Sequence, residues 1–268
     1  NRRYLGNKYR ILTFIKQIIS ENCGDFESFA DIFAGTGAVS SAYTDKILYT
    51  NDILYSNYLC HLTWFSDEVF DISKVANYIN LYNSEIPFEE NYMTQNFSGT
   101  YFSDKVCSKI GFIRENIENE FLSGKINSRE RAMLITSLLY GIDKIANTCG
   151  HYDAYRKNAD LPESFTMCVP EPNANLKHNH CFNEDTNELV KKISADVVYI
   201  DPPYNSRQYC DAYHLIENIA RWEKPEVFGV AKKMDRTALK SKYCTREAPA
   251  AFEDLIKNIS AKYIVVSY

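Results

Sequence analysis

An apolar strand that breaks off at two glycines constrains the fold of this chain more than any other feature. Residues 29–33 have the apolar character of a short buried strand, and Gly35 and Gly37 allow a sharp backbone turn directly after it. A second apolar strand over 46–50 follows, and Asp52 stands at its end. With a short helix between them, these elements predict a βαβ unit and therefore a parallel α/β sheet.

Hydrophobic spacing predicts the other elements and a division of the chain. The sheet pattern stops after the first unit and returns near residue 196, so we expect one discontinuous domain, 1–60 with 180–268, and an inserted, mainly helical region, 61–179. Residues 78–101 and 147–179 are expected to be irregular. The predicted helices are 9–21, 38–43, 103–124, 128–145, 212–222 and one starting at 249, and the predicted strands are 196–200 and 262–266.

Composition excludes several classes of protein. The 268 residues carry a net charge of -5 and contain no apolar run long enough for a membrane span, and the first residues lack the apolar core of a signal peptide. The eight Cys are scattered without zinc-ligand spacing, which favours reduced cytosolic thiols and no metal site. An acidic balance does not exclude nucleic acid, because a local basic patch is sufficient for binding.

The glycine turn permits two interpretations. It lacks the lysine of a P-loop, and Ser40 occupies the place of the last small residue in a dinucleotide-binding motif. The turn is therefore either a nucleotide site or a plain strand-to-helix connection. Asp52 favours the first, because an acid in this place accepts hydrogen bonds from ribose hydroxyls in doubly wound sheets. By itself, Asp52 is also typical of a helix cap.

The second informative motif is Asp-Pro-Pro-Tyr at 201–204, directly after the most apolar predicted strand. Ligands bind at this end of the strands in open α/β sheets. Prolines have no N–H, so the Asp201 carboxylate and the Pro202 carbonyl form a row of acceptors, with Tyr204 beside them as an aromatic face. This arrangement suits the amino group of an adenine or cytosine held out of its stack. The alternative is a proline turn with a capping Asp.

These motifs together resemble one enzyme family. Asp-Pro-Pro-Tyr after an apolar strand is the signature of amino-methyltransferases that use S-adenosylmethionine, and residues 3–8 are similar to the N-terminal motif of Dam-type, alpha-class DNA adenine methyltransferases. Within them, residues 147–155 and 201–209 resemble the branch that includes the FokI modification methylase. The resemblance covers nearly the whole chain, with the motifs in the family's order.

The resemblance implies a fold and a set of roles. The fold is a Rossmann-like methyltransferase sheet, with 61–179 as the target-recognition insertion. For the catalytic site it implies Asp201, Pro202 and Tyr204. For S-adenosylmethionine it implies Tyr4 against the cofactor, Lys8 at its carboxylate, the backbone of Ala34, Gly35 and Gly37, Asp52 at the ribose, Asp201, and Asp185 at the adenine, with Glu184 as the rival of Asp185. Asp185 is also compatible with a helix cap near Thr186.

DNA contacts are expected from a basic stretch after the catalytic motif and from Arg207 close to the base pocket. Specific base contacts are expected from the insertion, around 147–157. A solvated surface loop is the other interpretation of the basic stretch. The candidate cations in it are Lys232, Lys233, Arg236, Lys240 and Lys242, with Arg246 at its end.

The resulting functional hypothesis is methylation of the adenine N6 amino group in double-stranded DNA at a short site. The resemblance implies the modification half of a restriction-modification system in a bacterial cytoplasm, acting beside a cognate endonuclease without a stable complex. Cytosine N4 methylation, RNA or protein-glutamine methylation, and a catalytically inactive DNA-binding module are the alternatives. The stop at Tyr268 is abrupt for a sheet domain, so we also expect further C-terminal residues.

Overall fold

A computed structural model describes residues 4–172 and 177–267. Arg3, the first residue of the N-terminal motif, lies outside this part. The chain divides into two compact units. The sheet unit comprises Tyr4–Asp67, Pro172–Gln208 and Leu239–Tyr268, and the helical unit comprises Glu68–Glu171 and Tyr209–Ala238. The helical unit thus includes a segment that follows the catalytic motif, and its predicted function in target recognition remains a prediction.

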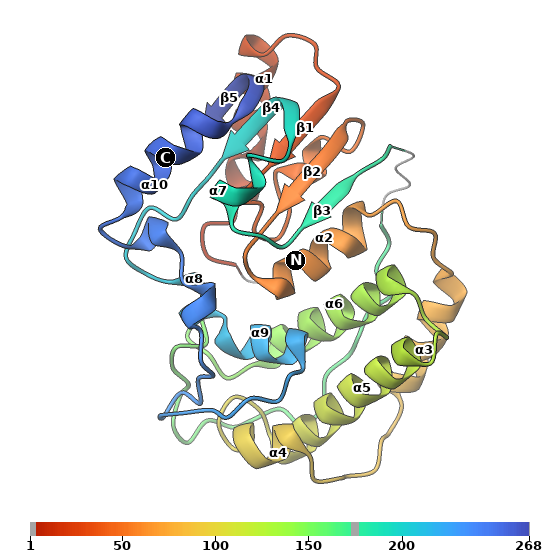
Figure 1. Ribbon diagram of the computed structural model, residues 1–268. Helices are drawn as coiled ribbons and strands as arrows, with labels where there is room; N and C mark the ends of the chain where they lie inside the picture. Colours follow the sequence, from red (N-terminus) through yellow and green to blue (C-terminus); the bar gives the residue numbers. More distant parts are fainter. Residues whose placement is uncertain (1–3, 173–176, 268) are drawn as a thin grey trace. The chain divides into compact units, whose positions relative to one another are not determined.

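The sheet unit is built on five parallel strands in the order β3-β2-β1-β4-β5 (Figure 1). Because all five run in the same direction, their carboxyl ends meet at one edge, where Asp52 follows β2 and Asp201 follows β4. This confirms the predicted parallel α/β sheet. The strands are β1 (Ser28–Asp31), β2 (Ile47–Asn51), β3 (His180–Phe182), β4 (Ser194–Ile200) and β5 (Ser260–Val266).

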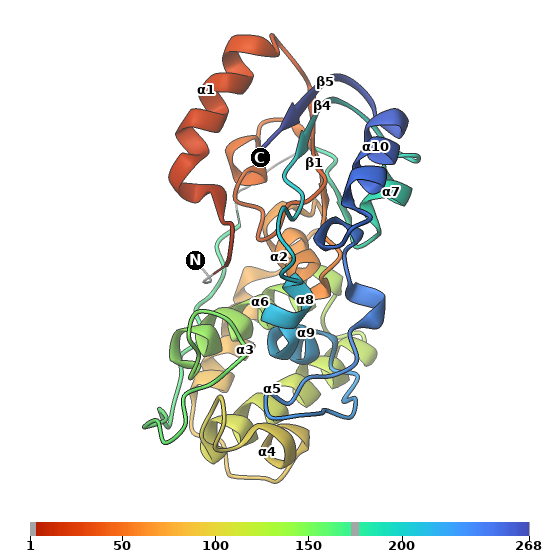
Figure 2. The same ribbon diagram turned by 90° about the vertical axis from the view of Figure 1, so that its left-hand side faces the viewer.

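Alternation along the strands builds an apolar core on each face of the sheet. Phe29 and Tyr199 pack with α1 (Leu12–Asn22), whereas Ala30 and Val198 pack with α10 (Ala248–Asn258). Figure 2 shows α1 on one side of the sheet and α10 with α7 on the other. Both faces are covered, so the strands are apolar on both sides. The unit also contains η1 (Lys8–Ile11), η2 (Ser40–Ala42), α2 (Tyr55–Phe65), α7 (Thr186–Leu189) and η4 (Lys242–Cys244).

The helical unit packs its helices around an apolar core that contains one fully buried arginine. Arg114 of α5 donates from Nε to the carbonyl of Ile219 at 2.8 Å and forms an ion pair with Glu118. Its N–H group thereby satisfies a backbone carbonyl in the last turn of a neighbouring helix. The helices are α3 (Ile72–Asn83), α4 (Tyr92–Phe97), α5 (Asp104–Leu122), α6 (Ser128–Ile145), α8 (Tyr209–Ala212) and α9 (His214–Arg221), with η3 at Thr237–Leu239. No helix in the described ranges is long and apolar enough to cross a membrane.

Two predictions about local structure were wrong. The segment 78–101 is not irregular, because α3 extends into it and α4 begins there with a capping box between Asn91 and Thr94. The helix expected over 38–43 is only the 3-10 turn η2, since Ser40 is fixed by its hydroxyl to Asp31 and the chain soon enters β2. The other predicted helices and strands are confirmed with small shifts at their ends.

Candidate active site

The glycine turn after β1 passes too close to its neighbours for any other residue. Gly35 and Gly37 have φ values of +54° and +81°, in the left-handed region. A Cβ at Gly35 would lie 3.0 Å from the ring of Tyr4, and one at Gly37 would lie 2.6 Å from the ring of Phe65. The amide of Ala34 donates to the carbonyl of Asn51 at 2.9 Å, which ties the turn to β2. The sharp turn is observed, and the approach of this backbone to a cofactor remains a prediction.

Asp52 is part of the same turn. Its Oδ2 accepts from the amide of Gly35 at 3.0 Å, and its Oδ1 accepts from the amide of Leu54 at 2.8 Å. These bonds fix the Asp52 carboxylate at the end of β2, beside the glycine turn. Tyr4 accepts from the amide side chain of Asn57 at 2.9 Å and lies against Gly35. The cofactor roles of Asp52 and Tyr4 remain predictions.

Asp31 is a candidate functional residue that the sequence did not identify. It is the last residue of β1 and is 1% exposed. The Ser40 hydroxyl donates to its Oδ2 at 2.8 Å, whereas Oδ1 has no hydrogen-bond partner within the described residues. Burial, together with the charges of Asp201 and Asp52, raises the pKa of Asp31 to about 7, although the hydrogen bonds from Ser40 oppose the rise. An acid directly before a glycine turn on a buried strand was the available signal.

His61 of α2 was also missed. Its Nε2 lies 2.8 Å from the carbonyl oxygen of Gly35, and because a carbonyl only accepts, we assign the proton to Nε2. The ring is fully buried, and this burial lowers the pKa of His61 to about 4. A neutral histidine thus fixes the orientation of the glycine turn. Periodicity alone does not distinguish such a histidine from an ordinary core residue.

The predicted acceptor row lies at the end of β4, and an unexpected cation accompanies it. Lys8 Nζ is 2.8 Å from Oδ2 of Asp201, and the two side chains are only 12% and 15% exposed. Oδ1 of Asp201 is buried and accepts no hydrogen bond from the described chain. Burial raises the pKa of Asp201, while the ammonium of Lys8 opposes this rise. The structure therefore places Lys8 on Asp201, and the predicted contact of Lys8 with a cofactor carboxylate remains a prediction.

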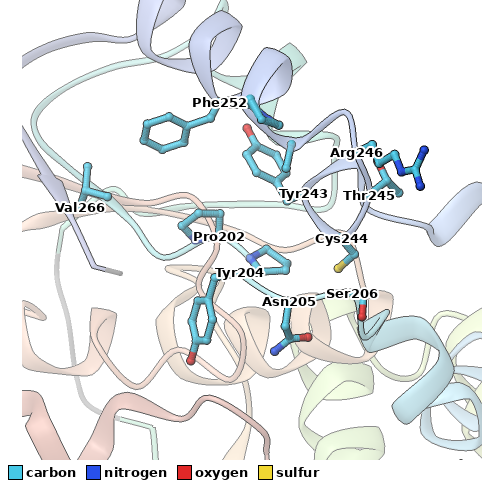
Figure 3. A pocket seen from close by; sticks show the side chains of 13 residues that line it. Pro202, Tyr204, Asn205, Ser206, Tyr243, Cys244, Thr245, Arg246, Phe252 and Val266 are labelled. Atoms are coloured by element: carbon cyan, nitrogen blue, oxygen red, sulfur yellow. The ribbon is translucent and has the colours of Figure 1, made fainter.

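A cavity of about 740 Å³ opens beside this row (Figure 3). Its walls are the loop after β4, the segment around η4, the start of α10 and the end of β5. Phe252 and Pro202 present apolar faces to it, and Tyr204 enters from the catalytic loop, 5.5 Å from Lys8 Nζ to the ring centroid. A cavity of this volume with apolar walls suits a flat heteroaromatic ring.

The two rival acids after β3 have separate structural roles. Asp185 is exposed and caps α7, accepting from the amides of Asn187 and Glu188 at 3.0 Å and 3.3 Å. Glu184 forms an ion pair with Lys192. The helix-cap interpretation of Asp185 is therefore observed. A capping carboxylate has further acceptor positions, and the predicted contact of Asp185 with the cofactor's adenine remains a prediction.

The predicted DNA-binding cations belong to both units. In the helical unit, Lys233 pairs with Asp153 and Arg236 pairs with Asp211, while Lys232 forms no ion pair with a described acid. In the sheet unit, Arg207, Lys240 and Lys242 are exposed and form no ion pair within the described chain. Gln208 joins their two segments, with its side chain donating to the carbonyl of Ser241 and accepting from its amide at 3.0 Å and 2.8 Å.

Two observations show that the sheet unit fits a nucleoside cofactor. The glycine turn lies at the carboxyl ends of the strands with a backbone that carries no side chain at Gly35 and Gly37, and the orphaned oxygens of Asp31 and Asp201 are buried acceptors at the same sheet edge. No group of three or more His, Cys, Asp or Glu side chains able to hold a metal ion occurs among the residues described.

This fold and this site define a Rossmann-like methyltransferase. The chain belongs to the D12 class N6 adenine-specific DNA methyltransferase family, whose model matches residues 4–268. Methyltransferases of this family use S-adenosylmethionine.

Three of the similar curated proteins are modification enzymes. The chain is 33% identical to modification methylase LlaI of Lactococcus lactis subsp. lactis, 36% to modification methylase StsI of Streptococcus sanguinis, and 33% to Type II methyltransferase M.FokI of Planomicrobium okeanokoites. Each match covers 99% of this chain, but only 46%, 43% and 44% of the respective relatives. The chain therefore spans less than half the length of these relatives.

Proposed function

We propose that this protein transfers a methyl group from S-adenosylmethionine to the N6 amino group of an adenine flipped out of double-stranded DNA. The observation that carries the proposal is the buried Oδ1 of Asp201, which has no partner in the described chain and lies at the end of β4 beside Pro202. An unpaired buried acceptor is costly unless a ligand completes it. An amino group donates two hydrogens, which suits the two acceptors of this row.

The residues of the row each have a role. Asp201 and the Pro202 carbonyl accept from the amino group and favour a tetrahedral nitrogen, whose lone pair is then free to react. Tyr204 supplies a stacking face for the base, and the cavity beside it has apolar walls that suit the ring. When bound, the cofactor supplies the activated methyl group. The amino nitrogen would take the methyl group by direct displacement, so that the N–C bond forms as the C–S bond to the cofactor breaks and the nitrogen gives up one proton; alignment of the two groups contributes much of the rate.

Lys8 supports the proposed role of Asp201 as an acceptor. Burial raises the pKa of the Asp201 carboxyl, and a protonated carboxyl no longer accepts through both oxygens. The Lys8 ammonium at 2.8 Å stabilises the ionised form and leaves Oδ1 available. We assign Lys8 to keep the catalytic acid charged, in addition to any contact with the cofactor.

The biological setting follows from the same comparison. Double-stranded DNA is the proposed substrate, and the region 61–179, with the helical unit that contains most of it, is proposed to read the site. The names of the relatives support a role as the modification part of a restriction-modification system in the bacterial cytoplasm. A cognate endonuclease would share its DNA site without forming a stable complex.

The proposal is tested by methyl transfer in vitro. Purified protein is incubated with methyl-tritiated S-adenosylmethionine and random-sequence duplex DNA, and the DNA is digested to nucleosides. We expect N6-methyladenosine in its deoxy form as the labelled product, and one cofactor site per chain by calorimetry. Labelled N4-methylcytosine would correct the substrate, and labelling of RNA but not DNA would contradict the proposal.

A further inference from the structure

The segment 147–155 resembles a family motif, yet the proposed chemistry gives it no role. It lies in the helical unit and forms a loop after α6 that its own side chains hold from within. Tyr152 is 1% exposed, and its carbonyl accepts from the Tyr101 hydroxyl at 2.6 Å and from His214 Nε2 at 2.7 Å. Its amide donates to the carbonyl of Ala212 at 2.7 Å. Two distant parts of the chain, around Tyr101 and around 212–214, thus converge on the backbone of Tyr152.

Asn147 fixes the start of the loop. Its side-chain amide donates to the carbonyls of Thr100 and Arg156 at 2.8 Å and 2.9 Å, and its oxygen lies 3.4 Å from the amide of Arg156. Both ends of this side chain are therefore engaged with backbone groups. Asn147 therefore closes the loop. Amide side chains can read base edges in DNA, but the side chain of Asn147 is already engaged and is not available for this.

Two cations that the sequence assigned to DNA are engaged here, one with the loop itself and one with α8, whose Ala212 carbonyl accepts from the Tyr152 amide. Lys233 Nζ lies 2.7 Å from Oδ1 of Asp153, and Arg236 Nε lies 2.6 Å from Oδ1 of Asp211. These four side chains are 19–30% exposed. Two cations and two carboxylates at these distances neutralise each other, so little positive charge remains to displace counterions from DNA.

Other cations close to the loop remain open to solvent. Arg156 and Lys157 directly follow it, are exposed, and form no ion pair within the described residues. Cys149 and Gly150 at the tip are also exposed, and they are small enough for close approach to a duplex. Because Asn147 bonds to the backbone of Arg156, the tip and these cations belong to one closed loop.

We propose that Lys233 and Arg236 are positioning residues, Lys233 bracing the loop 147–155 through Asp153 and Arg236 holding α8, to which the loop is bonded, and that DNA phosphates are contacted by Arg156 and Lys157 beside the loop's tip. This rests on the proposed function, because it takes duplex DNA as the substrate. It reverses the sequence-based assignment for Lys233 and Arg236 and transfers the phosphate contacts to two residues that sequence placed only in a broad base-reading region.

The two ends of one ion pair provide the test. Lys233→Met and Asp153→Asn are compared for affinity to a random-sequence duplex across a salt series, and for hydrogen exchange of the 147–155 amides. A brace predicts the same change for both variants: faster exchange, about three- to fivefold weaker binding, and an unchanged salt slope. If Lys233 binds a phosphate, its loss lowers the slope by about one unit, whereas Asp153→Asn tightens binding. That opposite pair of results would overturn the proposal.

Two further variants complete the experiment. The exchanged pair Lys233→Asp with Asp153→Lys should restore slow exchange, which separates bracing from general misfolding. Arg156→Ala with Lys157→Ala should lower the salt slope by about two units without changing exchange in the loop. An unchanged slope would contradict the phosphate contacts. If the wild-type protein binds no DNA, the proposed function fails. An equal acceleration of amide exchange in the loop 147–155 by Lys233→Met and Asp153→Asn would still support the brace.

Discussion

The two units treat their buried carboxylates in opposite ways. In the helical unit, Glu130 pairs with Lys74, and Glu118 pairs with two arginines. In the sheet unit, Asp31 and Asp201 each keep one buried oxygen without a partner, and no other carboxylate oxygen in the described ranges does so. Since a buried acceptor without a partner costs free energy, its presence indicates a place that a ligand completes. The difference separates a scaffold from a reaction site.

The largest expected difference between the two units comes from glycine substitutions. Gly37→Ala combines a left-handed backbone with a Cβ 2.6 Å from the Phe65 ring, so we expect a loss of roughly 2–5 kcal/mol of unfolding free energy and of cofactor binding. Gly99→Ala in the helical unit is the matched control, because φ is +68° but nothing lies within 4 Å. It should cost only about 1–2 kcal/mol. Thermal unfolding measures both, and equal losses would contradict the close packing of the turn.

Acid should also affect the units differently. Burial lowers the pKa of His214 to about 4, so the unfolded chain binds a proton between about pH 6.5 and pH 4 that the folded chain does not. The stability from neutral His214 is present above this window and lost as the pH falls through it, on the order of 3 kcal/mol. Lys233 and Arg236 also favour the neutral ring, whereas Asp153 opposes them.

The sheet unit contains a compensating group. His61 has the same sign as His214, but the pKa of Asp31 is raised to about 7, so the folded chain keeps a proton that the unfolded chain releases above about pH 4. Hydrogen exchange at pH 7 and pH 5, corrected for intrinsic rates, should therefore show a larger loss of protection around α9 than around β1. His214→Gln should remove the difference, and a larger loss around β1 would contradict it.

Removal of Lys8 tests how its charge controls the ionisation of Asp201 in the sheet unit. Without the ammonium, burial alone acts on Asp201 and its pKa rises. The rate then falls at a higher pH than in the wild type as the solution is acidified, because protonation removes the acceptor. Lys8→Met and Lys8→Arg are compared by the pH dependence of single-turnover rates at saturating cofactor. The Met variant should show the shift and the Arg variant should retain most of the wild-type profile. Identical profiles for Lys8→Met and wild type would exclude this role.

The smallest expected effect concerns the exposed cations of the sheet unit. Lys240→Ala with Lys242→Ala should weaken all DNA sequences alike and flatten the salt slope by about one to two units. The methylated site should stay the same, because these side chains are assigned to phosphates. Binding in a salt series and mapping of modified positions provide the measurement. A changed recognition site would show instead that the sheet unit takes part in base reading.

The sequence predicted what depends on neighbouring residues in the chain. Short continuous apolar runs located β1 and β4, and the rigid prolines located the acceptor row after β4. Contacts between distant residues were missed, since no local pattern indicates that Lys8 lies on Asp201 or that Lys233 lies on Asp153. The titration of Asp31 was missed for the same reason, because its pKa depends on burial and on charges that only the fold brings near.

The role of Asp201 as the oriented acceptor is the central claim, and its most direct test is the single-turnover rate of methyl transfer by Asp201→Ala. With saturating cofactor and DNA, loss of one preorganised group should slow the step about 100- to 1000-fold. Tyr204→Phe, the matched control in the same motif, keeps the stacking face and should retain much of the activity. Calorimetry should show that Asp201→Ala still binds the cofactor. A rate near that of the wild-type protein would contradict the account.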